Sequence, residues 1–120
     1  MIVIVDDHYD ICRGLEFVVR HAGFEARCFT DPCVALAYVT EHKAALMLVD
    51  LMMPQMGGLD VLRAVRSDPS TCQIPVLLMS SAASERHVAE ARMLGVERII
   101  SKSVDWTKLP ALIGSIVGNA

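Results

Sequence analysis

Residues 46–50 read Leu46-Met47-Leu48-Val49-Asp50, an unbroken apolar run that ends in a carboxylate. The same pattern recurs three times, and each run leads to polar residues able to handle a phosphoryl group. These are Ile2–Val5 before Asp6 and Asp7, Val76–Met79 before Ser80, and Ile99–Ile100 before Ser101 and Lys102. Unbroken apolar runs are typical of parallel strands that are covered on both faces. The sequence therefore predicts a parallel sheet that gathers these polar side chains at its carboxyl ends, where ligands bind.

Segments of helical period separate these runs, so strand and helix alternate five times along the chain. A further strand is predicted at 25–29, and helices are predicted near residues 8–22, 32–43, 58–67, 84–94 and 106–117. Parallel strands joined by helices require right-handed crossovers, which place helices on both faces of the sheet. The sequence thus indicates one α/β domain.

Polar residues and glycines mark where several of these helices begin and end. Asp31 followed by Pro32 is typical of an N-cap with proline at the first helical position. Ser84 is predicted to cap the fourth helix in the same way. Gly23 and Gly95 are predicted to end the first and fourth helices, because glycine readily adopts the conformation found after a helix end.

The last helix carries weak local signals. Pro110 lies within its first turns, where proline removes a backbone hydrogen bond. Gly114 and Gly118 interrupt the rest, each at a cost of roughly 1 kcal/mol relative to alanine. We therefore expect this helix to be held by the packing of its apolar side, which includes Trp106.

Length and composition predict a single domain over residues 1–120, large enough to bury a core. The chain is 53% apolar, yet no apolar stretch approaches the roughly 20 residues of a membrane span. We see no secretion signal and expect a cytoplasmic protein without a membrane partner, whose four scattered cysteines stay reduced. A net charge of −3 without a basic run argues against direct binding of nucleic acid.

Three carboxylates are predicted to crowd at the strand ends, where their burial without a partner would be very unfavourable. A divalent cation resolves this repulsion, and Mg²⁺ suits hard oxygen ligands. Asp50 is then placed to act as a nucleophile toward a phosphoryl group, while Lys102 and Ser80 are suited to contact phosphate oxygens. The alternative, in which Lys102 merely neutralises Asp50, leaves Asp6, Asp7 and Ser80 unexplained.

The segment that follows Asp50 completes a recognisable pattern. It reads Leu51-Met52-Met53-Pro54-Gln55-Met56-Gly57-Gly58, in which a proline and paired glycines define a loop over the site. With this loop, the chain resembles the receiver domain of bacterial two-component response regulators over essentially all 120 residues. An acidic pair, a D-x-M-M-P-x-x-x-G loop, a hydroxyl residue and a lysine follow the first, third, fourth and fifth strands in order.

The resemblance implies a flavodoxin-like, doubly wound five-stranded parallel sheet of order 2-1-3-4-5, with five helices in three α/β/α layers. It also implies a role for each residue that matches the pattern. Asp50 would be the phosphoacceptor. Mg²⁺ would be held by Asp7, Asp50 and the backbone carbonyl of Met52, with Asp6 acting mainly through water. The phosphate would be bound by Ser80, the backbone of Ser81 and Lys102.

By the same resemblance, the domain is a phosphorylation-dependent signalling switch. The phosphoryl group would come from a histidine kinase or phosphotransfer protein, and phosphorylation would change the binding of a downstream protein whose identity the residues do not give. The domain would catalyse only its own phosphorylation and dephosphorylation. A phosphatase with an aspartyl nucleophile is disfavoured, because Met52 stands where its second carboxylate is expected. Dimerisation on phosphorylation is a further hypothesis.

Two alternatives concern how the domain is used. One is a pseudo-receiver, which would bind partners without phosphorylation, although the full set of acidic residues, Ser80 and Lys102 argues against it. The other is a receiver excised from a longer DNA-binding regulator or hybrid kinase. The residues do not decide between a single-domain regulator and a fragment.

Three positions depart from the common receiver pattern. Ser103 replaces the proline that usually follows the lysine, so we expect a trans peptide bond and a relocated loop there. Ile99 replaces a frequent aromatic residue, so an aromatic rotamer switch at this strand is excluded. Gly57 occupies a position that is often polar and is expected to loosen the loop entrance.

Other residues near the predicted site have ordinary explanations. His8 is expected to lie on the surface at the start of the first helix, because Mg²⁺ prefers oxygen ligands. Met79 is expected in the core, whereas Met53 and Met56 are equally compatible with a loop surface that docks a partner.

Overall fold

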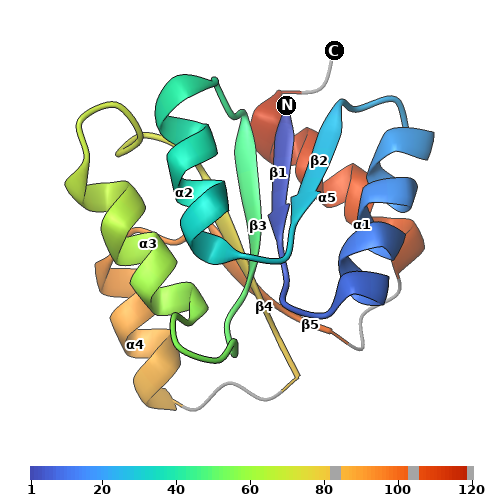
Figure 1. Ribbon diagram of the computed structural model, residues 1–120. Coiled ribbons are helices and arrows are strands. Elements are labelled where there is room, and N and C mark those ends of the chain that lie inside the picture. Colours follow the sequence, from blue (N-terminus) through green and yellow to red (C-terminus); the bar gives the residue numbers. More distant parts are fainter. Residues whose placement is uncertain (82–84, 103–105, 119–120) are drawn as a thin grey trace.

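A computed structural model describes residues 1–81, 85–102 and 106–118. Its five strands form one parallel sheet of order β2-β1-β3-β4-β5, and helices connect them (Figure 1). The strands are β1 (Ile2–Val5), β2 (Ala26–Phe29), β3 (Leu46–Asp50), β4 (Val76–Ser80) and β5 (Arg98–Ser101). The helices are α1 (Tyr9–His21), α2 (Pro32–Glu41), α3 (Gly58–Ser67), α4 (Glu85–Met93) and α5 (Leu109–Val117), with a 3₁₀ turn, η1 (Trp106–Lys108), before α5. The predicted strand order and fold class are confirmed.

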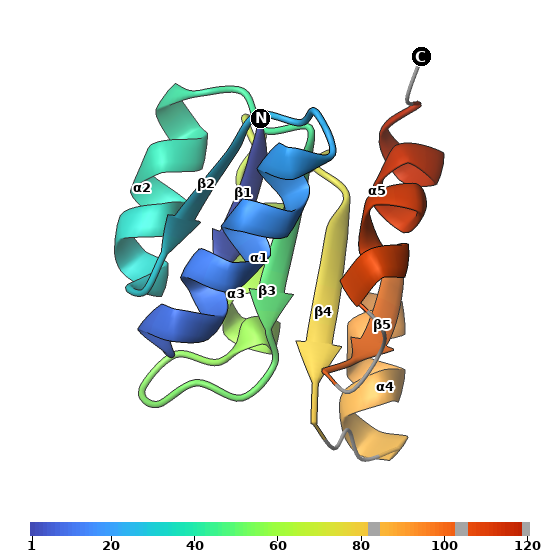
Figure 2. The same cartoon turned by 90° about the vertical axis from the view of Figure 1, so that its right-hand side faces the viewer.

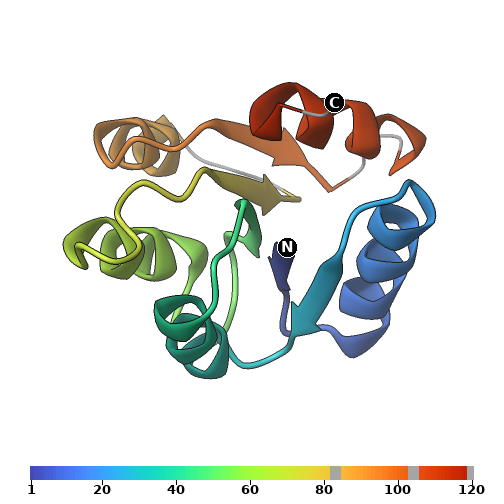
Figure 3. The same ribbon diagram turned by 90° about the horizontal axis from the view of Figure 1, so that it is seen from above.

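Helices cover both faces of the sheet and create two apolar cores. Figure 3 shows α1 and α5 on one face and α2, α3 and α4 on the other. Alternate residues of the central strands point into different cores: Val49 packs on the α2–α3 side and Leu48 on the α1–α5 side. Because both side-chain directions lead to a core, both must be apolar, which explains the unbroken runs of β1, β3 and β4.

The prediction that the strands are fully covered is, however, wrong for the two edge strands, β2 and β5. In β5, Arg98 and Ser101 are exposed, whereas Ile99 and Ile100 are half-buried. An edge strand has one neighbouring strand instead of two, so less of its surface is covered. The predicted boundaries also shift slightly, since Asp50 and Ser80 are the last residues of β3 and β4 and form part of the ladder.

Several predicted helix ends are confirmed. Asp31 Oδ1 accepts a hydrogen bond from the Cys33 backbone nitrogen at 2.9 Å, with Pro32 at the first helical position. Gly23 and Gly95 have positive φ angles of 100° and 73°. The predicted bounds of α1 and α2 were too wide, because α1 starts at Tyr9 and α2 ends at Glu41. The predicted cap at Ser84 lies outside the described residues.

The last helix differs from its prediction. The segment begins as the η1 turn, and α5 starts only at Leu109, so Pro110 lies in its first turn. The backbone nitrogens of a first turn have no partner within their helix, so proline there removes no hydrogen bond. The predicted weakening by Pro110 is therefore wrong, whereas the predicted packing is observed in the buried Leu109 and Ile113. No helix in the described part of the chain is long and apolar enough to cross a membrane.

Candidate functional site

The carboxyl ends of β1, β3, β4 and β5 bring the predicted site residues together. The parallel register pairs Val5 with Val49 and Ser80 with Ser101, which aligns the polar residues at the same edge. The ammonium of Lys102 lies 3.0 Å from Asp6 Oδ2 and 2.9 Å from Asp50 Oδ2. Asp6 is fully buried and Asp50 is 2% exposed, so the lysine that follows the edge strand bridges two buried carboxylates at the ends of central strands.

The backbone fixes this arrangement. The Lys102 nitrogen donates to the carbonyl of Ser80 at 2.9 Å, which continues the β4–β5 ladder by one residue. On the other side of the site, the Met52 nitrogen lies 3.3 Å from Asp50 Oδ1 and donates to it. The Asp50 carboxylate thus contacts a main-chain donor through one oxygen and the ammonium through the other.

Asp6 also organises the start of α1. Its Oδ1 accepts a hydrogen bond from the His8 backbone nitrogen at 2.9 Å. The His8 ring nitrogen Nδ1 lies 3.3 Å from Asp6 Oδ1 and 3.4 Å from Asp7 Oδ1. The His8 side chain is 62% exposed, in agreement with its predicted surface position. The contact with both carboxylates was not predicted, and the only sequence signal for it is that His8 directly follows the acidic pair.

Burial and neighbouring charges shift the pKa values of the paired groups. Burial raises the pKa of Asp50 above its ordinary value, the hydrogen bond from Lys102 opposes this rise, and the charge of Asp6 adds to it. Burial lowers the pKa of Lys102, but hydrogen bonds to Asp50 and Asp6 outweigh it, and the net direction is upward. The site therefore favours a charged lysine while it holds Asp50 in a less favourable environment than water.

The acidic cluster fits a divalent cation. One ligand atom each from Asp6, Asp7, His8 and Asp50 lies within 4.8 Å of the other three. Apart from the contacts with Lys102 and His8, no donor among the described residues reaches the buried oxygens Asp6 Oδ2, Asp7 Oδ1 and Asp50 Oδ2. The carboxylate oxygens suit Mg²⁺, whereas a histidine nitrogen does not. Since the three carboxylates outnumber the single ammonium by two charges, a divalent cation balances the site.

The loop after Asp50 is tightly closed by its glycines. The Gly58 nitrogen donates to the Leu51 carbonyl at 2.9 Å, and Gln55 adopts a positive φ of 67°. A Cβ atom on Gly57 would lie 2.9 Å from the same Leu51 carbonyl oxygen. The missing Cβ thus lets the loop approach the end of β3 closely, and the loosening of the loop entrance by Gly57 stays a prediction.

Replacing Gly58 with alanine is expected to lower the free energy of unfolding by about 1–3 kcal/mol. The added Cβ would meet the Asp50 carbonyl oxygen at 2.7 Å and the Leu51 Cα at 2.8 Å. These are backbone atoms next to the site, so they cannot move aside cheaply, and the clash outweighs the better helix propensity of alanine. Urea unfolding of both proteins measures the change, and an unaltered midpoint would contradict the predicted clash.

The remaining predicted residues occupy varied positions. Ser80 is buried at the end of β4, and Ser81 follows it on the surface. Met79 is 3% exposed, which confirms its place in the core. Met53 and Met56 are half-buried against the core, and their docking role stays a hypothesis. Ser103 lies outside the described residues, as does the predicted trans bond that precedes it.

Comparison with known proteins identifies the family. The model of the response regulator receiver domain matches residues 2–114. The sensory transduction protein RegX3 of Mycobacterium tuberculosis (strain ATCC 25618 / H37Rv) is 32% identical over 116 residues, which are 97% of this chain and 50% of RegX3. The chain thus spans about half the length of the curated relatives it matches.

Solved structures agree on the fold. The chemotaxis protein CheY4 of Vibrio cholerae superposes with a TM-score of 0.89 at 23% identity, covering 96% of each chain. A sensor protein from Polaromonas sp. JS666 gives 0.88 at 28% identity, covering 98% of this chain and 95% of the other. The chain belongs to the receiver domain family of two-component response regulators, whose members are signalling modules.

Proposed function

We propose that Asp50 is the phosphoacceptor of a receiver domain that extends over residues 1–120. The observation that carries this proposal is the buried Asp50 carboxylate, 2.9 Å from the Lys102 ammonium and close to two further carboxylates. An Asp50 oxygen attacks the phosphorus of a phosphohistidine, the phosphorus–nitrogen bond breaks, and an aspartyl-phosphate forms. The histidine nitrogen leaves with the electron pair of the broken bond.

The acidic cluster provides the ligands for Mg²⁺ in this proposal. Asp7, Asp50 and the Met52 carbonyl are the direct ligands, and Asp6 acts mainly through water. Bound Mg²⁺ supplies positive charge that offsets the negative charge of the carboxylates and of the incoming phosphoryl group. Asp6 has a second role, because it binds the Lys102 ammonium and thereby orients it toward Asp50.

Lys102 and the end of β4 are proposed to receive the phosphate. The ammonium lies beside the attacking carboxylate, so it is placed to bind one phosphoryl oxygen, while the Ser80 hydroxyl and the Ser81 backbone bind others. We propose that catalysis is limited to phosphorylation and dephosphorylation of Asp50, because Met52 stands where a phosphatase with an aspartyl nucleophile would carry its second carboxylate. The phosphoryl donor is a histidine kinase or phosphotransfer protein.

Phosphorylation is proposed to shift the domain between two conformations that differ in their affinity for a downstream protein or for a second copy of the domain. The curated relatives are about twice as long, so the alternative to a single-domain regulator is a longer regulator in which the receiver is one part and another part carries the output. The half-buried Ile99 on β5 replaces an aromatic switch residue, so Ser80 and Lys102 are the groups that respond to the phosphate.

Intact-mass measurement with Mg²⁺ and acetyl phosphate, a small phosphodonor, tests the proposal. We expect one phosphoryl increment on the chain, its loss when Mg²⁺ is chelated, and its loss in Asp50→Asn. Asp60→Asn is the matched control, because Asp60 is an exposed carboxylate on α3 and should leave the increment unchanged. An unmodified chain under all these conditions would overturn the proposal and favour an interaction module that works without phosphorylation.

A further inference from the structure

The indole of Trp106 occupies a notch in α1 that is created by a glycine. A Cβ atom on Gly14 would lie 3.1 Å from Cζ3 and 3.7 Å from Cη2 of Trp106. Gly14 lies inside α1, away from both helix ends, and has no positive φ angle. Glycine inside a helix costs roughly 0.5–1 kcal/mol relative to alanine. The presence of glycine at position 14 is therefore explained by the space that the indole occupies and not by an unusual backbone conformation.

The contact between Trp106 and Gly14 is not needed to fill the apolar core. The core between α1, α5 and the sheet is already closed by fully buried residues such as Leu15 and Ile113. Trp106 is only half-buried and packs at the margin of this core. The η1 turn that begins with Trp106 contacts α1 directly, and Figure 2 shows that turn between the end of β5 and α5. The indole thus fastens the start of the last helical segment to α1.

Trp106 is close in sequence to the lysine of the site. It follows Lys102 by four residues, a stretch that spans at most about 14 Å when fully extended. The last backbone hydrogen bond of the β5 ladder joins the Lys102 nitrogen to the Ser80 carbonyl. Because β5 is an edge strand, β4 supports it on one side only. The next described residue after Lys102 is Trp106, which packs on α1.

The helix to which Trp106 is fastened also carries part of the site. The chain enters α1 through Asp6, Asp7 and His8, and the Asp6 carboxylate bonds to the His8 nitrogen at the helix start. The same Asp6 carboxylate binds the Lys102 ammonium at 3.0 Å. Lys102 and Asp6 are therefore linked directly by their ion pair. They are also linked indirectly, because Trp106 follows Lys102 in the chain and packs on Gly14 of the helix that follows Asp6.

From this geometry we infer that Trp106 is a positioning residue for the phosphorylation of Asp50, an inference that rests on the function proposed above. The indole, seated against Gly14, anchors the chain at residue 106 on α1 and so limits how far Lys102, four residues earlier, can move from its place between Asp6 and Asp50. A lysine side chain has several rotatable bonds and no fixed direction of its own. Asp6 and Asp50 bind its ammonium, and a restrained backbone near Lys102 keeps the ammonium within reach of both carboxylates.

Filling the notch tests the inference. Gly14→Leu places a side chain where the indole sits, and Gly14→Ala adds a single methyl group that forces a smaller displacement. We expect phosphorylation of Asp50 by acetyl phosphate with Mg²⁺ to slow by about tenfold in Gly14→Leu and by less in Gly14→Ala. Thermal unfolding of both variants shows whether they remain folded, and the methyl variant keeps the test valid if the leucine variant does not.

A double-mutant cycle separates positioning from general damage to the fold. The same notch substitution is measured in a Lys102→Met background, with phosphorylation rate and beryllofluoride affinity as the two readouts. If Trp106 acts through Lys102, filling the notch has no further effect once the ammonium is gone. The mutation of Trp106→Ala should likewise remove the effect of Gly14→Leu, because no indole remains to be displaced.

Two results would overturn the inference. One is an unchanged phosphorylation rate in Gly14→Leu, and the other is an equal loss in the presence and absence of the Lys102 ammonium. These two results differ from a failure of the proposed function. In that case the unsubstituted chain would not be phosphorylated, and the inference about Trp106 would be overturned as well. The contact of Trp106 with α1 can be followed by fluorescence, because Trp106 is the only tryptophan of the chain.

Discussion

Replacing Lys102 with methionine is expected to lower the free energy of unfolding by about 2–4 kcal/mol at neutral pH in the absence of Mg²⁺. The ammonium contacts Asp6 at 3.0 Å and Asp50 at 2.9 Å, and both carboxylates are almost fully buried. Methionine preserves much of the volume of the side chain but leaves two like charges next to each other without a counterion. Proton uptake by one carboxylate limits the cost, which keeps it below the value for a fixed charge pair.

The size of this loss should depend on pH in a defined direction. Lys102 is one of the groups that holds down the pKa of Asp50, so that pKa rises further in Lys102→Met. A carboxyl group with a raised pKa in the folded state binds protons more tightly than in the unfolded state. The variant therefore gains stability relative to the parent as the pH falls from neutrality toward the ordinary carboxyl pKa of 3.8. In the parent, the raised pKa of Lys102 means that its contribution is complete below pH 10.5 and is lost at higher pH.

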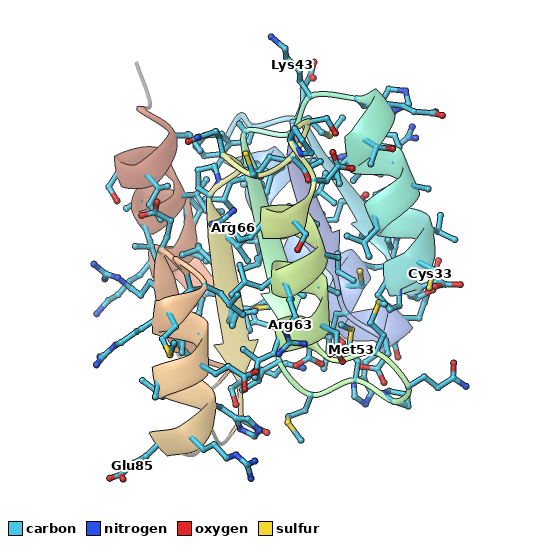
Figure 4. The ribbon with its side chains drawn as sticks, turned by 90° about the vertical axis from the view of Figure 1, so that its left-hand side faces the viewer. Cys33, Lys43, Met53, Arg63, Arg66 and Glu85 are labelled. Atoms are coloured by element: carbon cyan, nitrogen blue, oxygen red, sulfur yellow. The ribbon has the colours of Figure 1, made fainter. Side chains whose placement is uncertain are left out.

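Urea unfolding at several pH values measures both effects. Lys43→Met is the matched control, since Lys43 is exposed and lies at the opposite end of the molecule from the loop that carries Met53 (Figure 4). We expect the control to change stability by less than about 0.5 kcal/mol. A loss in Lys102→Met that matches the control, or that grows as the pH falls, would contradict the interpretation of Lys102 as the counterion of two buried carboxylates.

The convergence of the site residues could be predicted because it depends on the parallel direction of neighbouring strands. Asp6, Asp50, Ser80 and Lys102 each terminate or follow a buried apolar run, and parallel strands bring such ends to one edge. No long-range packing detail is needed for that conclusion. The role of glycine in the loop was harder to predict, because the close approach of Gly57 to Leu51 depends on the path of the backbone.

Contacts between distant elements could not be predicted from local patterns. Nothing in the sequence around Gly14 indicates that an indole ninety-two residues further along fills its notch, because this depends on how α1 and η1 pack. The sequence predicts one helix near 106–117 with Pro110 within its first turns, because the η1 turn and α5 read as one apolar segment. Its actual place in the first turn of α5 follows from where the 3₁₀ turn ends. The Gly14 contact depends on tertiary packing and the Pro110 position on where one turn ends, whereas the proposed site residues could be predicted from their places at strand ends.

Arg66 is another residue whose importance only the structure reveals. Its guanidinium donates to four backbone carbonyls, and Figure 4 shows it on α3 next to α4. The distances are 2.9 Å to Leu94 and 2.9 Å to Gly95, at the end of α4, and 3.2 Å to Cys72 and 2.7 Å to Ile74, in the loop before β4. Carbonyls at a helix end have no partner within the helix, so the guanidinium satisfies two of them and also fixes the loop.

Arg66→Met is expected to lower the free energy of unfolding by about 2–6 kcal/mol, because four carbonyls lose a donor and even an ordinary hydrogen bond contributes roughly 0.5–1.5 kcal/mol. Arg66→Lys should recover little of this loss, since one ammonium cannot reach all four carbonyls as the planar guanidinium does. Arg63→Met is the matched control on the same helix. Arg63 binds Asp60 and Glu90, but all three side chains are about half exposed, so its loss should cost less than about 1 kcal/mol.

Comparing the two arginine variants distinguishes a guanidinium that bonds to backbone from one that only joins surface charges. Urea unfolding gives the two stability changes, and hydrogen exchange of the amides in α4 shows where the loss is felt. We expect faster exchange in the last turn of α4 for Arg66→Met only, because its carbonyl partners Leu94 and Gly95 follow that helix directly. Equal losses in Arg66→Met and Arg63→Met would mean that the carbonyl contacts add nothing beyond surface charge, and that α4 is held against α3 by its apolar side chains alone.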